Sequence, residues 1–179
     1  MKILMRTLMP TLLICFLAPA AVVFAQDNPP KSASTQSDAK KAFAELKALT
    51  GSWQGTVMGK LINITIRITS SGNAILNEAT AEGGGVPDHE ITTFYVEGDR
   101  LLATHYCDAG NRSRMEGKLM PDGKSVEFTL LEVAGGTQRG FVKRMAFTMI
   151  DANHHVVELT FVMPDGKPVQ ASGEFQRTK

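Results

Sequence analysis

The sequence predicts an all-β fold, a single antiparallel meander β-barrel of about nine or ten strands with a short N-terminal amphipathic helix. The apolar period changes from helical to two after Gly51 and stays two to the C-terminus. Turn signals built from Gly, Asp and Asn recur at short spacing, which leaves no room for crossover helices. Because an open meander would expose two strand edges, we expect the sheet to close on itself.

The first 25 residues have the pattern of a signal peptide. Lys2 and Arg6 precede a long apolar stretch, and small residues typical of a cleavage site precede Gln26. The alternative is a signal anchor, which two prolines within the apolar stretch disfavour. We expect an exported protein, periplasmic or secreted, with no integral membrane segment after cleavage, because no later stretch reaches about 18 uninterrupted apolar residues.

Export would leave residues 26–179 with a nearly balanced charge and one thiol. The 19 basic residues less the two in the leader leave 17 against 18 acidic residues, a formal charge of −1. This balance does not favour nucleic acid or an anionic membrane as a partner. Cys15 leaves with the leader, so Cys107 has no second cysteine with which to form an internal disulfide.

Residues 26–37 lack large apolar side chains and are predicted to form a flexible linker before a barrel domain over residues 38–179. Ser37 is the expected N-cap of the helix, and Gly51 ends it. One helical face is apolar and carries Ala39, Phe43, Leu46 and Leu49. A single short helix cannot bury this stripe alone, so we expect it to pack against the barrel.

The hairpin turns set a register in which one face of the sheet is apolar. Pairing Glu97 with Arg100 places Thr92 opposite His105. Continued through a five-residue loop at 108–112 and a turn at Asp122-Gly123, this register pairs Glu90 with Cys107, Cys107 with Ser113, His105 with Met115, Gly117 with Phe128, and Leu119 with Val126.

The direction of Arg112 and Arg114 depends on the loop at 108–112. In this register both face water, whereas a one-residue slip would turn them inward and create an anion site. The later strands are expected to place Met145, Phe147 and Met149 opposite Phe161, Leu159 and Val157. His154-His155 is expected in the solvated turn between those strands.

The apolar face becomes polar at the end farthest from the Gly98 and Gly123 turns. A barrel lined in this way is typical of a ligand cavity, in which apolar walls supply affinity and a few polar groups fix orientation. We predict that the polar end consists of Glu90, Thr92, His105, Cys107, Ser113 and Met115. The predicted apolar walls are Phe94, Leu101, Phe128 and Phe147.

Other interpretations use the same residues. Glu90, His105 and Cys107 could hold a metal ion or act as a thiol triad, although they have no tight spacing motif and no identified oxyanion hole. The polar residues could also line a wet rim without a task, or large side chains could fill the barrel of an envelope interaction module. We assign no catalytic residue, no metal ligand and no cofactor.

The segment Leu49-Thr50-Gly51-Ser52-Trp53-Gln54-Gly55 resembles the opening of calycin barrels, the superfamily of lipocalins, fatty-acid-binding proteins and nitrobindins. The resemblance covers residues 42–177, and residues 89–115 are similar to exported bacterial calycin-like proteins of unassigned function. It implies that Trp53 closes the barrel base and that Arg177 stacks on it, a cation–π contact of about 0.5–2 kcal/mol.

The resemblance also bears on the ligand. Calycin barrels bind small apolar molecules, whereas nitrobindin-like proteins hold haem through a histidine on a strand near the C-terminus. Residues 168–177 contain no histidine, so haem is not expected, and His105 is the remaining candidate ligand. The sequence thus predicts an exported protein that binds a small, mostly apolar molecule in a barrel cavity.

Overall fold

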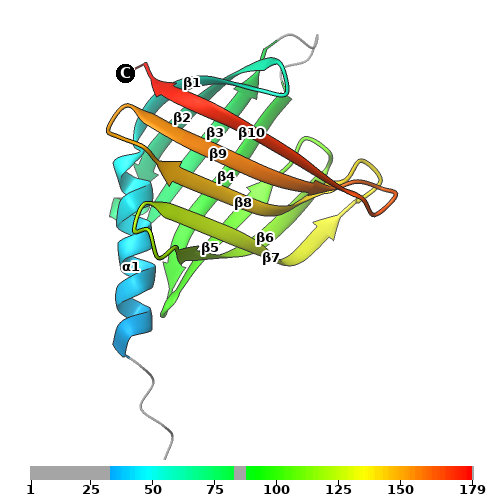
Figure 1. Cartoon of the computed structure of the whole chain (residues 1–179). Helices are drawn as coiled ribbons and strands as arrows, with labels where there is room; N and C mark the ends of the chain where they lie inside the picture. The colour runs from blue at the N-terminus through cyan, green and yellow to red at the C-terminus, as the bar shows by residue number, and fades with distance from the viewer. Residues whose placement is uncertain (1–32, 83–87, 179) are drawn as a thin grey trace, which may run out of the picture. The chain divides into compact units, whose positions relative to one another are not determined.

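The computed structural model describes residues 33–82 and 88–178, which form a closed barrel with a helix at one end (Figure 1). Consecutive strands are antiparallel neighbours, and β1 pairs with β10. The elements are α1 (Ala33–Ala48), β1 (Gly51–Val57), β2 (Lys60–Thr69), a 3-10 turn η1 (Ser70–Gly72), β3 (Ala74–Ala81), β4 (Asp88–Glu97), β5 (Arg100–Tyr106), β6 (Asn111–Leu119), β7 (Ser125–Gly135), β8 (Phe141–Met149), β9 (His154–Val162) and β10 (Pro168–Arg177). The predicted meander barrel is confirmed, and its closure pairs both edge strands.

The helix α1 packs against β4, β5, β6 and β7 and covers one end of the barrel (Figure 1). Its predicted apolar stripe is buried in the barrel core together with Ala42. The helix begins at Ala33, four residues before the predicted N-cap Ser37. No helix in the described part of the chain is long and apolar enough to cross a membrane.

The predictions for the N-terminal region fall largely on residues that are not described. The predicted signal peptide, residues 1–25, lies outside the described residues, as do residues 26–32 of the predicted linker.

The predicted register of β4 against β5 is confirmed, since Thr92 pairs with His105. The register of β5 against β6 is wrong by two residues, because His105 pairs with Ser113 rather than Met115. A shift of two residues keeps every side chain on its predicted face, since successive residues of a strand alternate between faces. Ser113 and Met115 are accordingly buried inside the barrel, and Arg112 is exposed outside it.

A loop shorter than the predicted 108–112 explains this shift. The Cys107 N–H donates to the Asn111 carbonyl over 3.0 Å, so three residues separate Cys107 from its partner instead of the predicted five. Gly110 has φ 85°, the left-handed conformation that a three-residue hairpin loop places at its last position. The glycine therefore sets the strand pairing on which the site geometry depends.

One of the later predicted pairings is correct and the other is shifted by two residues. Gly117 pairs with Phe128 as predicted. Phe147 pairs with Val157, two residues from its predicted partner, because β9 begins at His154 and shortens the preceding loop. The error again preserves the inner face, so the apolar side of β8 and of β9 is the predicted one.

Three phenylalanine rings fill the half of the barrel next to α1. Phe94 lies 5.2 Å from Phe128 and 5.5 Å from Phe147 between ring centres, and Phe128 lies 6.4 Å from Phe147. All three rings are buried, in the tilted and edge-on orientations that aromatic pairs favour. Gly117 makes room for one of them, because a Cβ there would lie 2.5 Å from the Phe128 ring. This cluster, the phenylalanine plug, makes that half of the barrel solid.

The predicted contact between Trp53 and Arg177 is confirmed. The guanidinium lies 4.0 Å from the centre of the buried indole, and the indole N–H donates to the Leu49 carbonyl over 2.7 Å. The guanidinium also donates to three backbone carbonyls, those of Ala48, Thr50 and Ala152. Arg177 therefore joins the last strand to the end of α1, whose final carbonyls have no partner within the helix.

We expect Arg177→Lys to lower the free energy of unfolding by about 1–3 kcal/mol, measured by urea unfolding. Lysine keeps the charge but loses the planar fork that serves three carbonyls and the indole at once. Arg67→Lys is the matched control, because Arg67 pairs with Glu78 on the exposed outer surface, and it should change stability by less than about 0.5 kcal/mol. Equal losses in the two variants would contradict this role.

His155 is buried, so its predicted place in a solvated turn is wrong, whereas His154 is exposed. The early start of β9 turns the His155 ring inward, where it stacks on Phe175 at 5.3 Å and meets the edge of Trp53 at 4.3 Å. Neither ring nitrogen has a hydrogen-bond partner among the described residues. Burial, followed by the nearby charge of Arg177, lowers the pKa of His155 to about 4.

This histidine makes stability depend on pH. An unfolded histidine has a pKa of about 6.5, so between pH 6.5 and 4 the unfolded chain binds more protons than the native one. The free energy of unfolding should therefore fall by about 2 kcal/mol from pH 7 to pH 5 on account of His155. Urea unfolding at both pH values should show a fall smaller by about this amount in His155→Phe. The exposed-residue control His89→Gln should behave as the wild type, and a fall in His155→Phe as large as in the wild type would contradict the assignment.

Candidate functional site

A cavity of about 420 Å³ lies in the half of the barrel away from α1. Its walls are mainly apolar and include Val57, Ile62, Met145, Val157, Leu159 and Phe161. Phe147 of the phenylalanine plug also lines the cavity, so the solid half forms its floor. The barrel is thus divided along its axis into a packed half and a hollow half.

Polar side chains gather on one part of the cavity wall. Asn77, Glu90, Thr92 and His105 come from the neighbouring strands β3, β4 and β5, and Asp108 follows β5. Thr92 pairs with both Asn77 and His105, which brings the three strands into register at this level. Lys60 lines the cavity from β2.

The predicted site residues separate into three groups. Glu90, Thr92, His105 and Phe147 line the cavity. Cys107 is half-buried beside it and contacts Glu90. A third set is buried in the barrel but does not line the cavity: Phe94, Leu101, Ser113, Met115 and Phe128.

Several cavity residues were missed at the sequence level. Asn77 occupies an inner position between Ile75 and Ala79, and this alternation was the available signal. The walls from β9 and β10 were not identified because strand alternation shows which face is apolar but not how far along the axis the packing extends.

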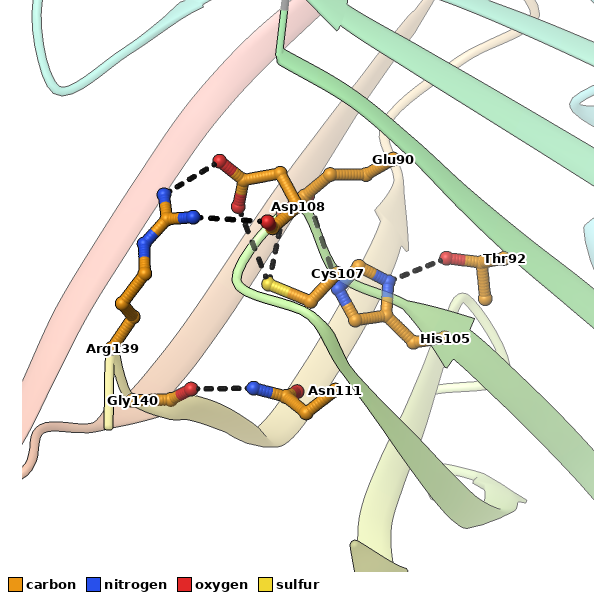
Figure 2. A network of polar contacts seen from close by, with 8 residues as sticks. All are labelled: Glu90, Thr92, His105, Cys107, Asp108, Asn111, Arg139 and Gly140. Atoms are coloured by element: carbon orange, nitrogen blue, oxygen red, sulfur yellow. Dashed lines mark hydrogen bonds and ion pairs between the residues drawn. The ribbon is translucent and has the colours of Figure 1, made fainter. Parts of the chain in front are cut away.

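The polar groups at the cavity wall form a connected cluster (Figure 2). The Thr92 hydroxyl and His105 Nδ1 are 2.9 Å apart, and His105 Nε2 lies 3.8 Å from a Glu90 carboxylate oxygen. The Cys107 thiol donates to the other Glu90 oxygen over 3.2 Å. A single carboxylate therefore faces both the imidazole and the thiol.

Two side chains, Arg139 and Asn111, hold the β5–β6 loop beside this cluster through hydrogen bonds (Figure 2). The Arg139 guanidinium donates to the Asp108 carbonyl and carboxylate over 3.1 and 3.2 Å. The Asn111 amide donates to the carbonyls of Gly136 and Gly140 over 3.1 and 2.7 Å. Both contacts tie the β5–β6 loop to the β7–β8 loop, which holds Cys107 in place.

Burial determines the protonation of the imidazole and of the thiol in this cluster. It lowers the pKa of His105 despite the opposing effect of Glu90, so the imidazole is neutral at pH 7. Burial, and then the Glu90 charge, raise the pKa of Cys107 to about 12. A nucleophilic cysteine requires a lowered pKa, so the arrangement opposes the thiol-triad interpretation.

The barrel is similar to solved structures of low sequence identity. Rv2717c of M. tuberculosis is 14% identical, with a TM-score of 0.59 over 77% of this chain and 98% of its own. A protein of unknown function from the DUF3598 family of Nostoc punctiforme PCC 73102 is 13% identical, with a TM-score of 0.53 over 74% of this chain. This chain spans about half (49%) of that second protein. EF1p2_mFAP2b bound to DFHBI is 13% identical over 77% of this chain and 98% of its own, with a TM-score of 0.39.

No family model and no curated protein matches the sequence. The likeness to the first two structures concerns the fold alone, and it fits the resemblance to calycin barrels noted from the sequence. The function must therefore be argued from the cavity and its side chains.

The raised pKa of Cys107 predicts an unreactive thiol. At pH 7.5, iodoacetamide should alkylate the native protein more slowly than the same protein unfolded in urea, because only the thiolate reacts. Glu90→Gln removes the charge that helps to raise the pKa and should speed alkylation. The control Glu174→Gln, an exposed position on β10, should leave the rate unchanged. A native rate equal to the unfolded rate would contradict the raised pKa.

Proposed function

We propose that this protein is an exported carrier or sensor of the calycin type that holds a small, mostly apolar molecule in its barrel cavity. The observation that supports the proposal most strongly is the cavity of about 420 Å³, which falls within the usual range for small-molecule sites. The signal-peptide pattern of residues 1–25 supports export.

The distribution of side chains suggests the chemistry of the ligand. An apolar body would pack against β8 and β9, where Met145, Val157 and Leu159 line the cavity. One polar group would hydrogen-bond to the amide of Asn77, the hydroxyl of Thr92 or the carboxylate of Glu90. The binding energy would come from the walls and the orientation from this polar patch.

Two features of the wall favour tolerance of related ligands. Met58 and Met145 line the cavity with flexible, polarisable side chains that adapt to different shapes. The alternative of an interaction module with a filled barrel describes only the half that contains the phenylalanine plug.

Filling the cavity should abolish binding of an apolar probe. Ala79→Phe places a ring in the cavity, and its affinity for N-phenyl-1-naphthylamine, measured by fluorescence titration, should fall by at least about tenfold, equivalent to 1.4 kcal/mol. Thr80→Phe is the matched control, because the next residue of β3 points to the opposite face of the sheet. It should bind the probe as the wild type does.

Equal affinity in the two variants would contradict a ligand site inside the barrel. The natural ligand is best sought by native mass spectrometry of the protein purified from its own host, where a bound molecule appears as a fixed mass increment. The same spectrum tests export, because cleavage after Ala25 would leave a chain that begins at Gln26.

A further inference from the structure

We propose that Glu90, His105 and Cys107 form a binding site for one thiophilic divalent transition-metal ion, with Zn²⁺ as the best fit, on the wall of the cavity. The proposal concerns the polar cluster alone and stands whether or not the cavity holds an apolar molecule. Its chemistry is that of a mixed carboxylate, imidazole and thiolate ligand set.

The three side chains already lie at separations that suit a shared metal ion. One donor atom from each residue lies within 4.8 Å of the other two. Ligands bound to Zn²⁺ at 2.0–2.3 Å in a tetrahedron stand about 3.3–3.8 Å apart. The distance between the Cys107 sulfur and a Glu90 oxygen is 3.2 Å, and that between His105 Nε2 and the other Glu90 oxygen is 3.8 Å. Small rotations of these side chains would therefore complete the ligand set.

The imidazole supplies an independent indication of a ligand. His105 is only 3% exposed, and its Nε2 has no hydrogen-bond partner among the described residues. A buried polar atom without a partner costs about 1–3 kcal/mol, so its placement requires an explanation. This nitrogen faces the Glu90 carboxylate, toward the centre of the cluster (Figure 2).

Thr92 orients the ring for this role. Its hydroxyl lies 2.9 Å from His105 Nδ1, and when Nδ1 carries the proton and donates to this oxygen, the lone pair of Nε2 is left for a metal. Metal-binding histidines commonly use their second nitrogen in this way. Thr92 is thus a positioning residue and not a ligand.

The charges of the ligands balance that of the ion. Zn²⁺ would displace the Cys107 proton into water and bind the resulting thiolate, which together with the Glu90 carboxylate offsets both positive charges. A neutral assembly avoids the cost of a buried, uncompensated charge. Glu90 and His105 line the cavity, so the fourth position of the ion would face inward and accept water or a polar group of a bound molecule.

Hydrogen bonds hold the β5–β6 loop, and with it the Cys107 thiol, in position to bind a metal ion. The contacts of Arg139 with Asp108 and of Asn111 with Gly140 tie it to the β7–β8 loop on the far side of the cluster. Metal sites need such outer contacts, because a mobile ligand loses affinity through the entropy of ordering it.

The test is a titration of the purified protein, freed of metal by a chelator, with Zn²⁺ in competition with a chromophoric chelator. We expect one ion per chain. Cys107→Ser and His105→Gln should each weaken binding by more than about 100-fold, and Thr92→Val by about 10–100-fold. His89→Gln is the matched control, because His89 is exposed one residue from Glu90, and it should bind as the wild type does.

Co²⁺ supplies a readout that a loss of stability cannot imitate. The wild type and Thr92→Val should show the thiolate-to-cobalt charge-transfer absorption, and Cys107→Ser should lack it while its circular dichroism stays native. Two results would overturn the proposal. One is the absence of stoichiometric Zn²⁺ binding by the wild type, and the other is unchanged affinity in folded Cys107→Ser.

Discussion

The packing of Phe94, Phe128 and Phe147 is the constraint on which the rest of this molecule depends. The three buried rings stand between 5.2 and 6.4 Å apart and occupy the barrel cross-section near α1. They give the helix an apolar surface on which to bury its stripe, and they stop the core at a defined level. Phe147 also lines the cavity, so the open space begins where these rings end. The cavity is the consequence of a core that ends halfway along the barrel.

Two other devices keep this arrangement in place. At the helix end, Arg177 of β10 contacts the indole of Trp53 on β1 and donates to the Ala48 carbonyl at the end of α1 and to the Thr50 carbonyl that follows it. One side chain thus connects the first strand, the last strand and the helix. At the cavity end, the short loop closed by Gly110 places Cys107 beside Glu90. The packed end thus stabilises the fold, while the cavity end carries the polar groups that can bind a ligand.

The sequence predicted the closed meander, the inner face of strands β4 to β9 and the contact of Trp53 with Arg177. These follow from local patterns, because alternation and turn residues are read over a few positions. Two registers were wrong by two residues, since the face pattern is unchanged by an even shift and cannot detect it. The burial of His155 was missed for a related reason, because the residue types of the loop before β9 do not show where the loop ends and the strand begins. The end of the solid core was not predictable either, since it depends on side chains from strands far apart in the chain.

The sequence therefore predicted the polar residues on β4 and β5 that line the cavity, but it did not predict how far along the barrel the cavity extends. Glu90, Thr92 and His105 belong to one hairpin whose turn fixes their pairing, and the structure brings them together at the cavity wall. Phe94, Leu101 and Phe128 share the same face but lie below the floor. Position along the barrel axis, and not the face of the strand, separates the lining of the cavity from its support.

The division into a solid and a hollow half is tested most directly by NMR of methyl-labelled protein under xenon, which enters dry apolar cavities. We expect the methyl signals of Ile62, Val157 and Leu159, which line the cavity, to shift with xenon pressure. Those of Ile75 and Val126, buried in the packed half, should not move. Shifts confined to the packed half, or none at all, would contradict it.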